Sequence, residues 1–551
     1  MANLIDMTNS TLSQNAFCFE TRTIDSEKIS VPIEEARFGI LNFAAITANE
    51  TNDVVEFLFV IDCSGSMSDR CSDGRSKMQH IIHTLKNMIL FLHEHTNTQV
   101  FITVNAFDSI IYKIIKRTNI TEENLQEIIA KIEKVQPRGS TNIQYALENS
   151  AQYISELQTN YPTHIINHIF MTDGEATDGS RDITILKGLV VENLMNAFIG
   201  FGVDHDAALL NGIGSVGKSS YYFIDKLENA GLIYGEILHS IVYKVLGDAE
   251  INITNGLIYD FKTNTWVEKL PIGNIISEAN KTYNIITSQP TQFKAEIAGK
   301  FGEMIVIYPS RQTEEIDETL LAKHQFRQRT LQLMYEVNDY CKKKRENEIS
   351  FNVSVFMRYQ SNSNNQTDNA QDINTTLTEE KTKMSKKLHD FMDEMKKYMA
   401  ENNLNDDKFM KNLCDDIYIC FRTFDTRFGN MYCTARQTSQ GSQRQYTTSH
   451  TVDFEEEANY NVRFLQAPIL RRGVNIGRIQ RQTNAFTNLD DEYNDLENLP
   501  APHIMQHELS HFEDTPYLTP QATQVMRYVS ASVNYDDDLE EADSSSTRDI
   551  I

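Results

Sequence analysis

The amino-acid sequence predicts an α/β protein: a doubly wound, mainly parallel sheet, followed by a small β-sandwich, a helical region and a disordered acidic tail. The apolar run VVEFLFVID (54–62) leads directly into a segment with apolar residues at helical spacing. Strand-like and helix-like runs then alternate to about residue 247. Beyond that point the apolar period changes to two, returns to a helical period and ends in polar sequence.

The parallel sheet is expected over residues 54–247. A continuous β-branched run is typical of a strand covered on both faces, and four further strand-like runs follow it: TQVFITVNAF, HIINHIFMTDG, LMNAFIGFG and SYYFID. Helical patterns such as EENLQEIIAKIEKV and NIQYALENSAQYISEL separate these runs. Strands that alternate with helices indicate βαβ units, which place helices on both faces of a parallel sheet.

Short strands are expected on both sides of that region. Residues 248–312 carry period-two runs such as Phe293, Ala295 and Ile297 between charged residues, and this pattern predicts a small β-sandwich. Segment 28–53 contains RFGILNFAAITANE and is expected to add a strand to that module, which makes the module discontinuous in sequence. Residues 1–27 are polar and are expected to form a mobile leader.

Residues 313–430 are predicted to be mostly helical, with a polar linker near 360–376. Apolar residues recur on one helix face in 376–400 and in 407–424. We interpret these stripes as the core of a helical bundle rather than as a partner-binding groove. The remainder, 431–551, is low in complexity, rich in proline and acidic near its end, and is expected to be largely disordered.

Composition excludes several classes of protein. The 551 residues contain 51 Lys and Arg against 77 Asp and Glu, a net charge of −26, which disfavours a nucleic-acid or membrane-surface binder. Seven scattered cysteines without a C-x-x-C pair argue against a disulfide scaffold. The N-terminal sequence lacks the basic and apolar parts of a secretory signal. The most apolar window, GLIYGEILHSIVYKVLG, contains Glu236, His239 and Lys244, so an amphipathic helix is expected there. We therefore expect a cytoplasmic protein and leave its oligomeric state open.

The sharpest motif is IDCSGSM, directly after the first buried strand. Asp62, Ser64 and Ser66 give the pattern D-x-S-x-S, Thr141 opens a predicted helix, and Asp173 ends another predicted strand. Ligands bind at the carboxyl ends of strands in open α/β sheets, so these side chains are expected to converge. Five oxygen donors without His or Cys favour Mg²⁺ or Mn²⁺ over zinc. Because hydroxyl ligands are neutral, the ion would keep much of its charge and attract an external carboxylate.

With these residues, the parallel-sheet region resembles a von Willebrand factor type A domain, and the motif is similar to the metal-ion-dependent adhesion site of that family. The resemblance implies that Ser64, Ser66 and Thr141 bind the metal directly and that Asp62 and Asp173 act largely through water. It also implies that an Asp or Glu of a partner protein completes the coordination. We therefore expect a non-enzymatic protein-interaction module.

Other features refine this resemblance. The helix expected at 229–247 is the element that would shift between states. The stretch GFGVDHDAALL (200–210) is similar to intracellular family members, including plant members with ubiquitin-ligase modules, and there Asp204 or Asp206 is expected to cap a helix and His205 to lie in a loop. No Cys and His array for a RING is present in the sequence, so ligase activity is not carried over. The architecture is also similar in outline to uncharacterised proteins of large DNA viruses, which leaves a virion location open.

The C-terminal tail contains sequence features that indicate functions other than metal-dependent protein binding. His507, Glu508 and His511 form HELSH, a match to the H-E-x-x-H zinc-peptidase motif, but flanking prolines leave room for only a short helix. A zinc peptidase, or a ligase-like scaffold without its own RING, is therefore the alternative function. An arginine cluster in 471–481 is expected to be a solvated loop or a docking peptide. The apolar island TPYLTPQATQVMRYVS (515–530) has the character of a linear binding motif that orders on contact.

Overall fold

The computed structural model places most of the chain, and its side chains are described except over 345–378. The described residues are 11–48, 53–71, 73–96, 98–202, 205–224, 230–302, 304–313, 317–361, 368–426, 429–447 and 515–531. All of them belong to one compact unit. HELSH and the 471–481 cluster lie outside the described residues. Within the described part, no helix has both the length and the hydropathy needed to cross a bilayer.

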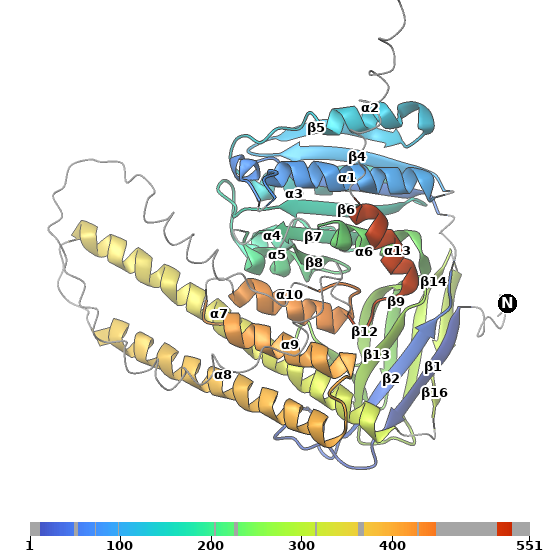
Figure 1. Cartoon of the computed structure of the whole chain (residues 1–551), viewed down its shortest axis with the longest axis vertical. Helices are drawn as coiled ribbons and strands as arrows, with labels where there is room; N and C mark the ends of the chain where they lie inside the picture. Colours follow the sequence, from blue (N-terminus) through green and yellow to red (C-terminus); the bar gives the residue numbers. More distant parts are fainter. Residues whose placement is uncertain are drawn as a thin grey trace, which may run out of the picture. The chain divides into compact units, whose positions relative to one another are not determined.

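A six-stranded sheet in the order β5-β4-β3-β6-β7-β8 forms the centre of the first module (Figure 1). Its strands are β3 (Val55–Asp62), β4 (Val100–Phe107), β5 (Ile111–Asn119), β6 (Ile165–Thr172), β7 (Met195–Phe201) and β8 (Ser220–Ile224). Neighbouring strands run parallel except for the antiparallel β4–β5 pair. Every residue of β3 is buried, because helices cover both faces of the sheet. The predicted doubly wound, mainly parallel sheet is confirmed.

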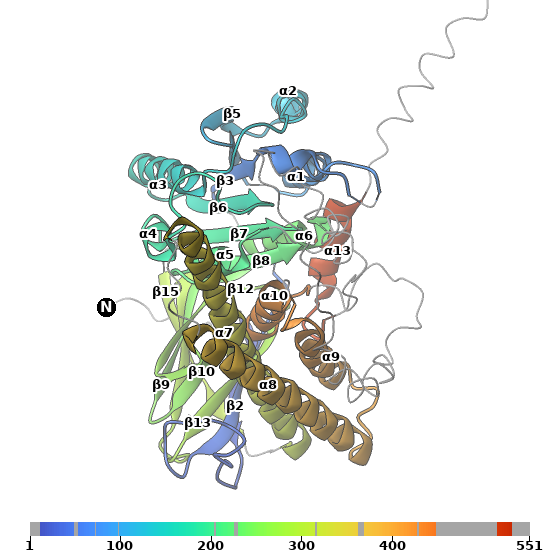
Figure 2. The same cartoon turned by 90° about the vertical axis from the view of Figure 1, so that its left-hand side faces the viewer.

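Helices lie on both faces of this sheet. Figure 2 shows α3, α4 and α5 on one side and α1 and α6 on the other. The elements are η1 (Gly65–Ser68), α1 (Lys77–Glu94), α2 (Glu122–Ile132), α3 (Ile143–Asn160), α4 (Ile183–Lys187), α5 (Ala207–Gly214) and α6 (Ala230–Val242). Local sequence sets their starts: Ser76 and Gln79 form a capping box before α1, and Asp206 caps α5 as expected.

The second module is a sandwich of two sheets around one apolar core. One sheet has the order β11-β10-β13-β2-β1-β16 and the other β12-β9-β14-β15. The strands are β1 (Leu12–Phe19), β2 (Arg37–Ala45), β9 (Lys244–Thr254), β10 (Leu257–Asp260), β11 (Thr265–Val267), β12 (Lys269–Ile276), β13 (Asn280–Thr287), β14 (Lys294–Phe301), β15 (Met304–Pro309) and β16 (Arg311–Gln312). The strand expected within 28–53 is β2, which pairs antiparallel with β13.

Two expectations at the edges of the sandwich need correction. The leader expected at 1–27 contains β1, whose Phe17 and Phe19 rings each lie 4.8 Å from the Phe293 ring in the core. The helix expected over 229–247 ends at Val242, and β9 begins at Lys244, because the residues after it enter the sandwich core. In both places a short apolar run is too brief to reveal its period.

The helical region contains α7 (Glu318–Ser361), α8 (Asp368–Glu401), α9 (Lys408–Thr423) and α10 (Gly429–Ser442). The apolar stripe of α8 is buried at Leu388, Met392 and Met395, as a bundle core requires. The polar linker expected near 360–376 is shorter than predicted, since the backbone is helical again from residue 368. Helix propagation costs little once a packed segment has nucleated it.

The tail expected to be disordered from residue 431 contains two helices that pack on the rest of the chain. Most side chains of α10 are buried although many are polar, and hydrogen bonds explain why. Gln440 Nε2 donates to Asp416 Oδ2 at 2.8 Å, and Arg436 Nη1 lies 3.2 Å from Asp416 Oδ1. Low hydropathy therefore does not exclude burial where polar groups satisfy one another.

The second helix, α13 (Pro520–Ser530), packs against α6 and α1 (Figures 1 and 2). It buries Val525, Met526 and Val529, so the apolar island expected to order on contact is bound by its own chain. The two helices approach closely because α6 has glycines at positions four residues apart. A Cβ on Gly231 would lie 2.6 Å from Ser530 Cα, and one on Gly235 would lie 2.5 Å from Met526 Cα.

We expect Gly235→Val to displace α13 from α6. The added side chain meets backbone, which cannot rotate away, and overpacking of this kind costs about 1–3 kcal/mol. Hydrogen exchange of the full chain should show amides of 520–530 exchanging at least about tenfold faster, while β3 amides keep their protection. Ser240→Val, which places the same side chain at a half-buried position of α6, is the control. Unchanged exchange in α13 would contradict the packing described here.

Candidate metal site at the carboxyl edge of the sheet

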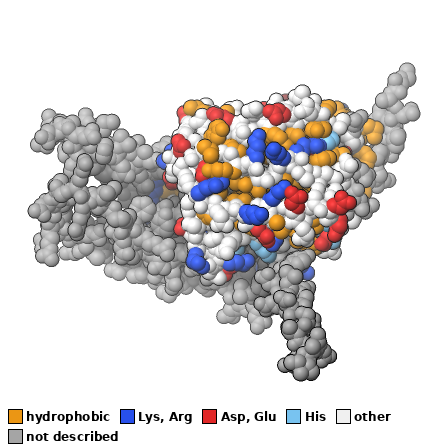
Figure 3. All heavy atoms as spheres, turned by 90° about the horizontal axis from the view of Figure 1, so that it is seen from above, with side chains coloured by type: hydrophobic (Ala, Val, Ile, Leu, Met, Phe, Trp, Pro, Cys, Tyr) orange, Lys and Arg blue, Asp and Glu red, His pale blue; other side chains and the backbone are white. Residues whose placement is uncertain are grey.

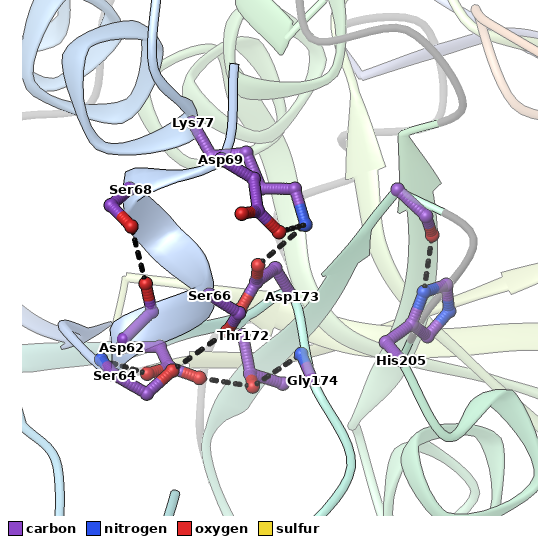
Figure 4. Close-up of polar contacts among 12 residues, drawn as sticks. Asp62, Ser64, Ser66, Ser68, Asp69, Lys77, Thr172, Asp173, Gly174 and His205 are labelled. Carbon is purple, nitrogen blue, oxygen red and sulfur yellow. Dashed lines mark hydrogen bonds and ion pairs between the residues drawn. The ribbon is translucent and has the colours of Figure 1, made fainter. Parts of the chain in front are cut away.

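Four of the five residues predicted to form a metal site lie together at the carboxyl ends of β3 and β6 in Figure 4, namely Asp62, Ser64, Ser66 and Asp173. Asp62 is the last residue of β3, and Asp173 follows the last residue of β6. Ser64 and Ser66 lie at the turn into η1, with their hydroxyl oxygens 3.1 Å apart. Thr141 precedes α3, and its Oγ1 and Ser66 Oγ flank the same point beside Gly174, at 3.6 and 3.8 Å from an ideal Cβ there.

Asp62 holds the turn that carries Ser64 and Ser66, called the serine turn below. Its Oδ1 accepts the backbone N–H of Ser64 at 2.7 Å, and its Oδ2 accepts the Thr172 hydroxyl at 2.5 Å. Both carboxylate oxygens are thus engaged by the protein itself. This arrangement suits a carboxylate that acts on a metal through water rather than by direct contact, which is the role the family resemblance implies.

The charges at the site favour a cation. Asp62 and Asp173 are fully buried, and burial together with the neighbouring Asp173 carboxylate raises the pKa of Asp62 to about 7. Two buried carboxylates repel each other unless positive charge lies close to them. Hydroxyl and carboxylate oxygens are also the donors that hard divalent ions such as Mg²⁺ prefer. The residues present therefore fit a divalent metal.

Lys77 is a site residue that the sequence analysis missed. Its Nζ donates to Asp173 Oδ2 at 2.7 Å, while Ser66 Oγ donates to Asp173 Oδ1 at 2.8 Å. A buried lysine in the first turn of a helix is unfavourable for the helix dipole, and this feature could have signalled a carboxylate partner. Lys77 offsets part of the negative charge of the site.

Asp108, which follows β4, is a second residue that the sequence analysis missed. It is buried, and its Oδ1 accepts the Ile110 N–H at 2.9 Å. Its Oδ2 lies 2.5 Å from where a Cβ of Gly139 would stand, and Gly139 has φ +70. Only glycine fits that position, and its carbonyl accepts the N–H of Gly65 at 3.2 Å. This contact ties the Thr141 loop to the serine turn.

His205 lies away from Asp62, Ser64, Ser66 and Asp173 in Figure 4. Its Nδ1 is 2.8 Å from the Gly202 carbonyl oxygen, and its Nε2 is 2.7 Å from the Tyr221 hydroxyl. It is a loop residue, as the sequence predicts, and its ring nitrogens are engaged by its own loop and by β8. Among the described residues, no three His, Cys, Asp or Glu side chains gather as a metal site, so a metal at this edge relies on serine and threonine hydroxyls.

We expect Lys77→Met to tighten divalent-metal binding about three- to tenfold, because the ammonium repels a second cation in the same buried space. Calorimetric titration of the full chain with Mn²⁺ measures the change. Lys86→Met is the matched control, since Lys86 lies on the same helix but pairs with Glu133 at 2.6 Å. Weaker Mn²⁺ binding by Lys77→Met would show that the lysine positions Asp173 more than it competes with the metal.

Comparisons with known proteins agree with this architecture. Residues 56–236 match the family model of the von Willebrand factor type A domain. A von Willebrand factor A domain-containing protein of Dictyostelium discoideum is 26% identical over 192 residues, which are 34% of this chain and 19% of that protein. A second protein from this organism is also 26% identical, and the match covers 21% of its length. The chain therefore spans about a fifth of each of these curated relatives.

The matches among solved structures include proteins from Catenulispora acidiphila and Sulfolobus acidocaldarius. A von Willebrand factor type A protein from Catenulispora acidiphila has a TM-score of 0.44 at 14% identity, over 62% of this chain and 84% of that one. The ArnB paralog VWA2 from Sulfolobus acidocaldarius has a TM-score of 0.46 at 11% identity, over 79% of this chain and 100% of that one.

Proposed function

Because the chain contains a von Willebrand factor type A domain at residues 56–236, we propose that it is a metal-dependent protein-interaction protein that captures an Asp or Glu of a partner protein. The observation that carries the proposal is the convergence of three hydroxyls and two buried carboxylates at one edge of the sheet. A bound Mg²⁺ or Mn²⁺ would supply an open coordination position for the carboxylate oxygen of the partner.

Each residue of the metal site has a distinct role. Asp62 fixes the serine turn, so that Ser64 and Ser66 present their hydroxyls on one side. Thr141 presents a third hydroxyl from the loop that Gly139 holds. Neutral donors leave positive charge uncompensated, and this matters in a chain of net charge −26, which otherwise repels acidic partners.

We further propose that this role is not enzymatic and is exercised inside cells. A nucleophilic serine needs an adjacent base, whereas the Ser66 hydroxyl donates to Asp173, a carboxylate that Lys77 also engages. All seven cysteines lie among the described residues and none forms a disulfide, as is usual for proteins of reducing compartments.

A pull-down of the full chain from cell lysate tests the proposal. It compares Mg²⁺ with chelator, and wild type with the double variant Asp62→Ala, Asp173→Ala. Partners that disappear under both chelation and mutation support metal-mediated capture. The control is Asp406→Ala, which removes a fully exposed carboxylate far along the chain. Partners that remain bound in every condition would refute the proposal.

A further inference from the structure

A cavity of about 1310 Å³ lies at the opposite edge of the parallel sheet from the metal site. Residues before or at the start of β3, β6, β7 and β8 line one side of it, namely Asp53, Val54, Ile165, Ile166, Met195 and Ser220. The sandwich, α7 and the segment after α10 line the rest. The cavity is large enough for a small molecule, for which pockets of about 300–1,000 Å³ are usual.

The lining is basic although the chain is acidic. Eight lysine and arginine side chains line the cavity, against four aspartate and glutamate side chains. On the outer face seen in Figure 3, by contrast, basic and acidic side chains are mixed. Three of the lining lysines pair with two carboxylates, since Lys218 and Lys300 share Asp248 and Lys244 pairs with Asp53. The remaining positive charge is concentrated elsewhere in the cavity.

Arg444 is the lining residue that most clearly indicates an anion-binding site. Its guanidinium carbon lies 3.8 Å from the centre of the Tyr222 ring, and only 9% of the residue is exposed. Among the described residues, its buried Nη2 has no hydrogen-bond partner, and the carboxylate whose charge acts on it is Glu236. A buried guanidinium without an acceptor is costly in free energy, and such groups are normally paired. Stacking on an aromatic ring leaves the edge of the guanidinium fork available for an anion.

Three more cationic side chains line the cavity with Arg444, namely Lys281, Lys262 and Arg327. Lys281 Nζ donates to the Ser442 carbonyl at 3.0 Å, and Lys262 Nζ donates to the Ser219 carbonyl at 3.4 Å. Arg327 donates to the Thr282 carbonyl at 3.0 Å and to the carbonyl of Gln440 at 2.8 Å. Within the described part of the chain, none of the three forms an ion pair. Burial and the neighbouring arginines lower the pKa of Lys281 to about 8, although the Glu236 charge opposes the shift.

Glu236 is the buried carboxylate beside this group, and it compensates the charge only in part. Its Oε1 accepts the N–H of Gln445 at 2.8 Å, whereas its Oε2 has no partner among the described residues. Burial raises its pKa, so its ionised form is disfavoured. Asp260 also lines the cavity, and its charge acts on Lys262. The four cations therefore face at most two carboxylates, and their positive charge is in excess.

We propose that this cavity is a binding site for a small molecule that carries several phosphate groups, held by Arg444, Lys281, Lys262 and Arg327. Arginine binds phosphate through parallel N–H bonds, and lysine adds a compact charge. Several phosphates on one molecule match several cations in excess of the carboxylates in one cavity. The ligand would contact the type A domain, the sandwich and the helical region together, and it would lie away from the metal site.

The test is calorimetric titration of the full chain, after a high-salt wash, with sodium tripolyphosphate and with inositol hexakisphosphate at physiological ionic strength. We expect saturable binding by the wild type and a loss of at least about tenfold in affinity for Arg444→Met and for Lys281→Met. Lys131→Met is the control, because it removes an exposed lysine of α2 that pairs with Glu127, and it should change affinity less than about twofold.

Thermal unfolding separates binding from folding. Without ligand, Arg444→Met should unfold at the wild-type temperature or above it, because the variant removes a buried charge that lacks a partner. With tripolyphosphate, the wild type should gain stability and the variant should gain none. Unfolding of ligand-free Arg444→Met at a lower temperature would mean that the arginine is structural, and it would overturn the proposal.

A second source of anions is the chain itself, because the acidic segment DFEEE (453–457) follows Arg444 in the sequence. A variant with Glu455, Glu456 and Glu457 changed to Gln distinguishes the two sources. If both this variant and the wild type bind tripolyphosphate, the small-molecule site is supported. If only the variant binds it, the acidic segment fills the cavity and the proposal fails. It also fails if neither protein binds.

Discussion

The Asp173→Ala variant should bind Mn²⁺ at least about 100-fold more weakly than wild type in calorimetric titration of the full chain. Two effects of this substitution weaken Mn²⁺ binding. The variant removes a buried carboxylate next to the three hydroxyls, and it leaves the Lys77 ammonium, which lies 2.7 Å from Asp173 Oδ2, without this partner in the same space. The site then changes from attracting a cation to repelling one.

The control for this experiment is Asp178→Ala. It removes the same charge from the same loop, but the Asp178 side chain is exposed and its Oδ1 accepts the N–H of Gly179. Its Mn²⁺ affinity should stay within about twofold of wild type, since an exposed charge acts through solvent. Equal losses in the two variants would mean that only net charge matters, and the site described here would be wrong.

The Glu56→Ala variant should lower the free energy of unfolding of the parallel-sheet module by about 3 kcal/mol. Glu56 is buried at the start of β3, and its Oε1 accepts two N–H groups of Arg117 at 2.6 and 3.0 Å. The Nδ1 of His164 lies 2.7 Å from the same oxygen. The Arg117 guanidinium is sandwiched between the Phe101 and Tyr161 rings, so it cannot easily turn to water once its partner is removed.

Urea denaturation followed by fluorescence measures this change. Glu127→Ala is the matched control, because Glu127 pairs with Lys131 on the exposed surface of α2 and should contribute about 0.5 kcal/mol or less. If Glu56→Ala is no less stable than Glu127→Ala, the buried ion pair does not hold the edge of the sheet.

The sequence was sufficient to predict the parallel sheet because its pattern is local. β3 is buried along its whole length, and five apolar residues in succession between Glu56 and Asp62 are typical of a central strand. The predicted site follows from the same logic, since Asp62 and Asp173 end neighbouring parallel strands and must share one edge of the sheet.

Lys77 and Asp108 could not be found in this way. Their roles depend on pairs that lie far apart in sequence, such as Lys77 with Asp173 and Asp108 with the glycine loop at Gly139. A single sequence shows that a charged residue exists at a position but not which distant group it meets. Only the unfavourable helix position of Lys77 gives a local hint.

The polar C-terminal segments were misjudged for a different reason. Hydropathy indicates disorder in the stretch of α10, yet its side chains are buried by hydrogen bonds to other helices, as between Asn338 Nδ2 and Gln437 Oε1 at 2.6 Å. Similarly, α13 has too few apolar residues to signal a packed helix, and it is held because α6 offers glycines at Gly231 and Gly235. Burial here depends on partners that lie 99 residues away for the Asn338–Gln437 pair and further for α13, and composition does not reveal them.

The most direct test of the central claim is a crystal structure of the full chain grown with Mn²⁺, with data collected for anomalous scattering by the metal. We expect one strong peak within about 2.0–2.4 Å of the hydroxyl oxygens of Ser64, Ser66 and Thr141, with at least one coordination position open to solvent or to a carboxylate. A peak at His507 and His511, or none at the carboxyl edge of the sheet, would contradict metal-mediated capture by this domain.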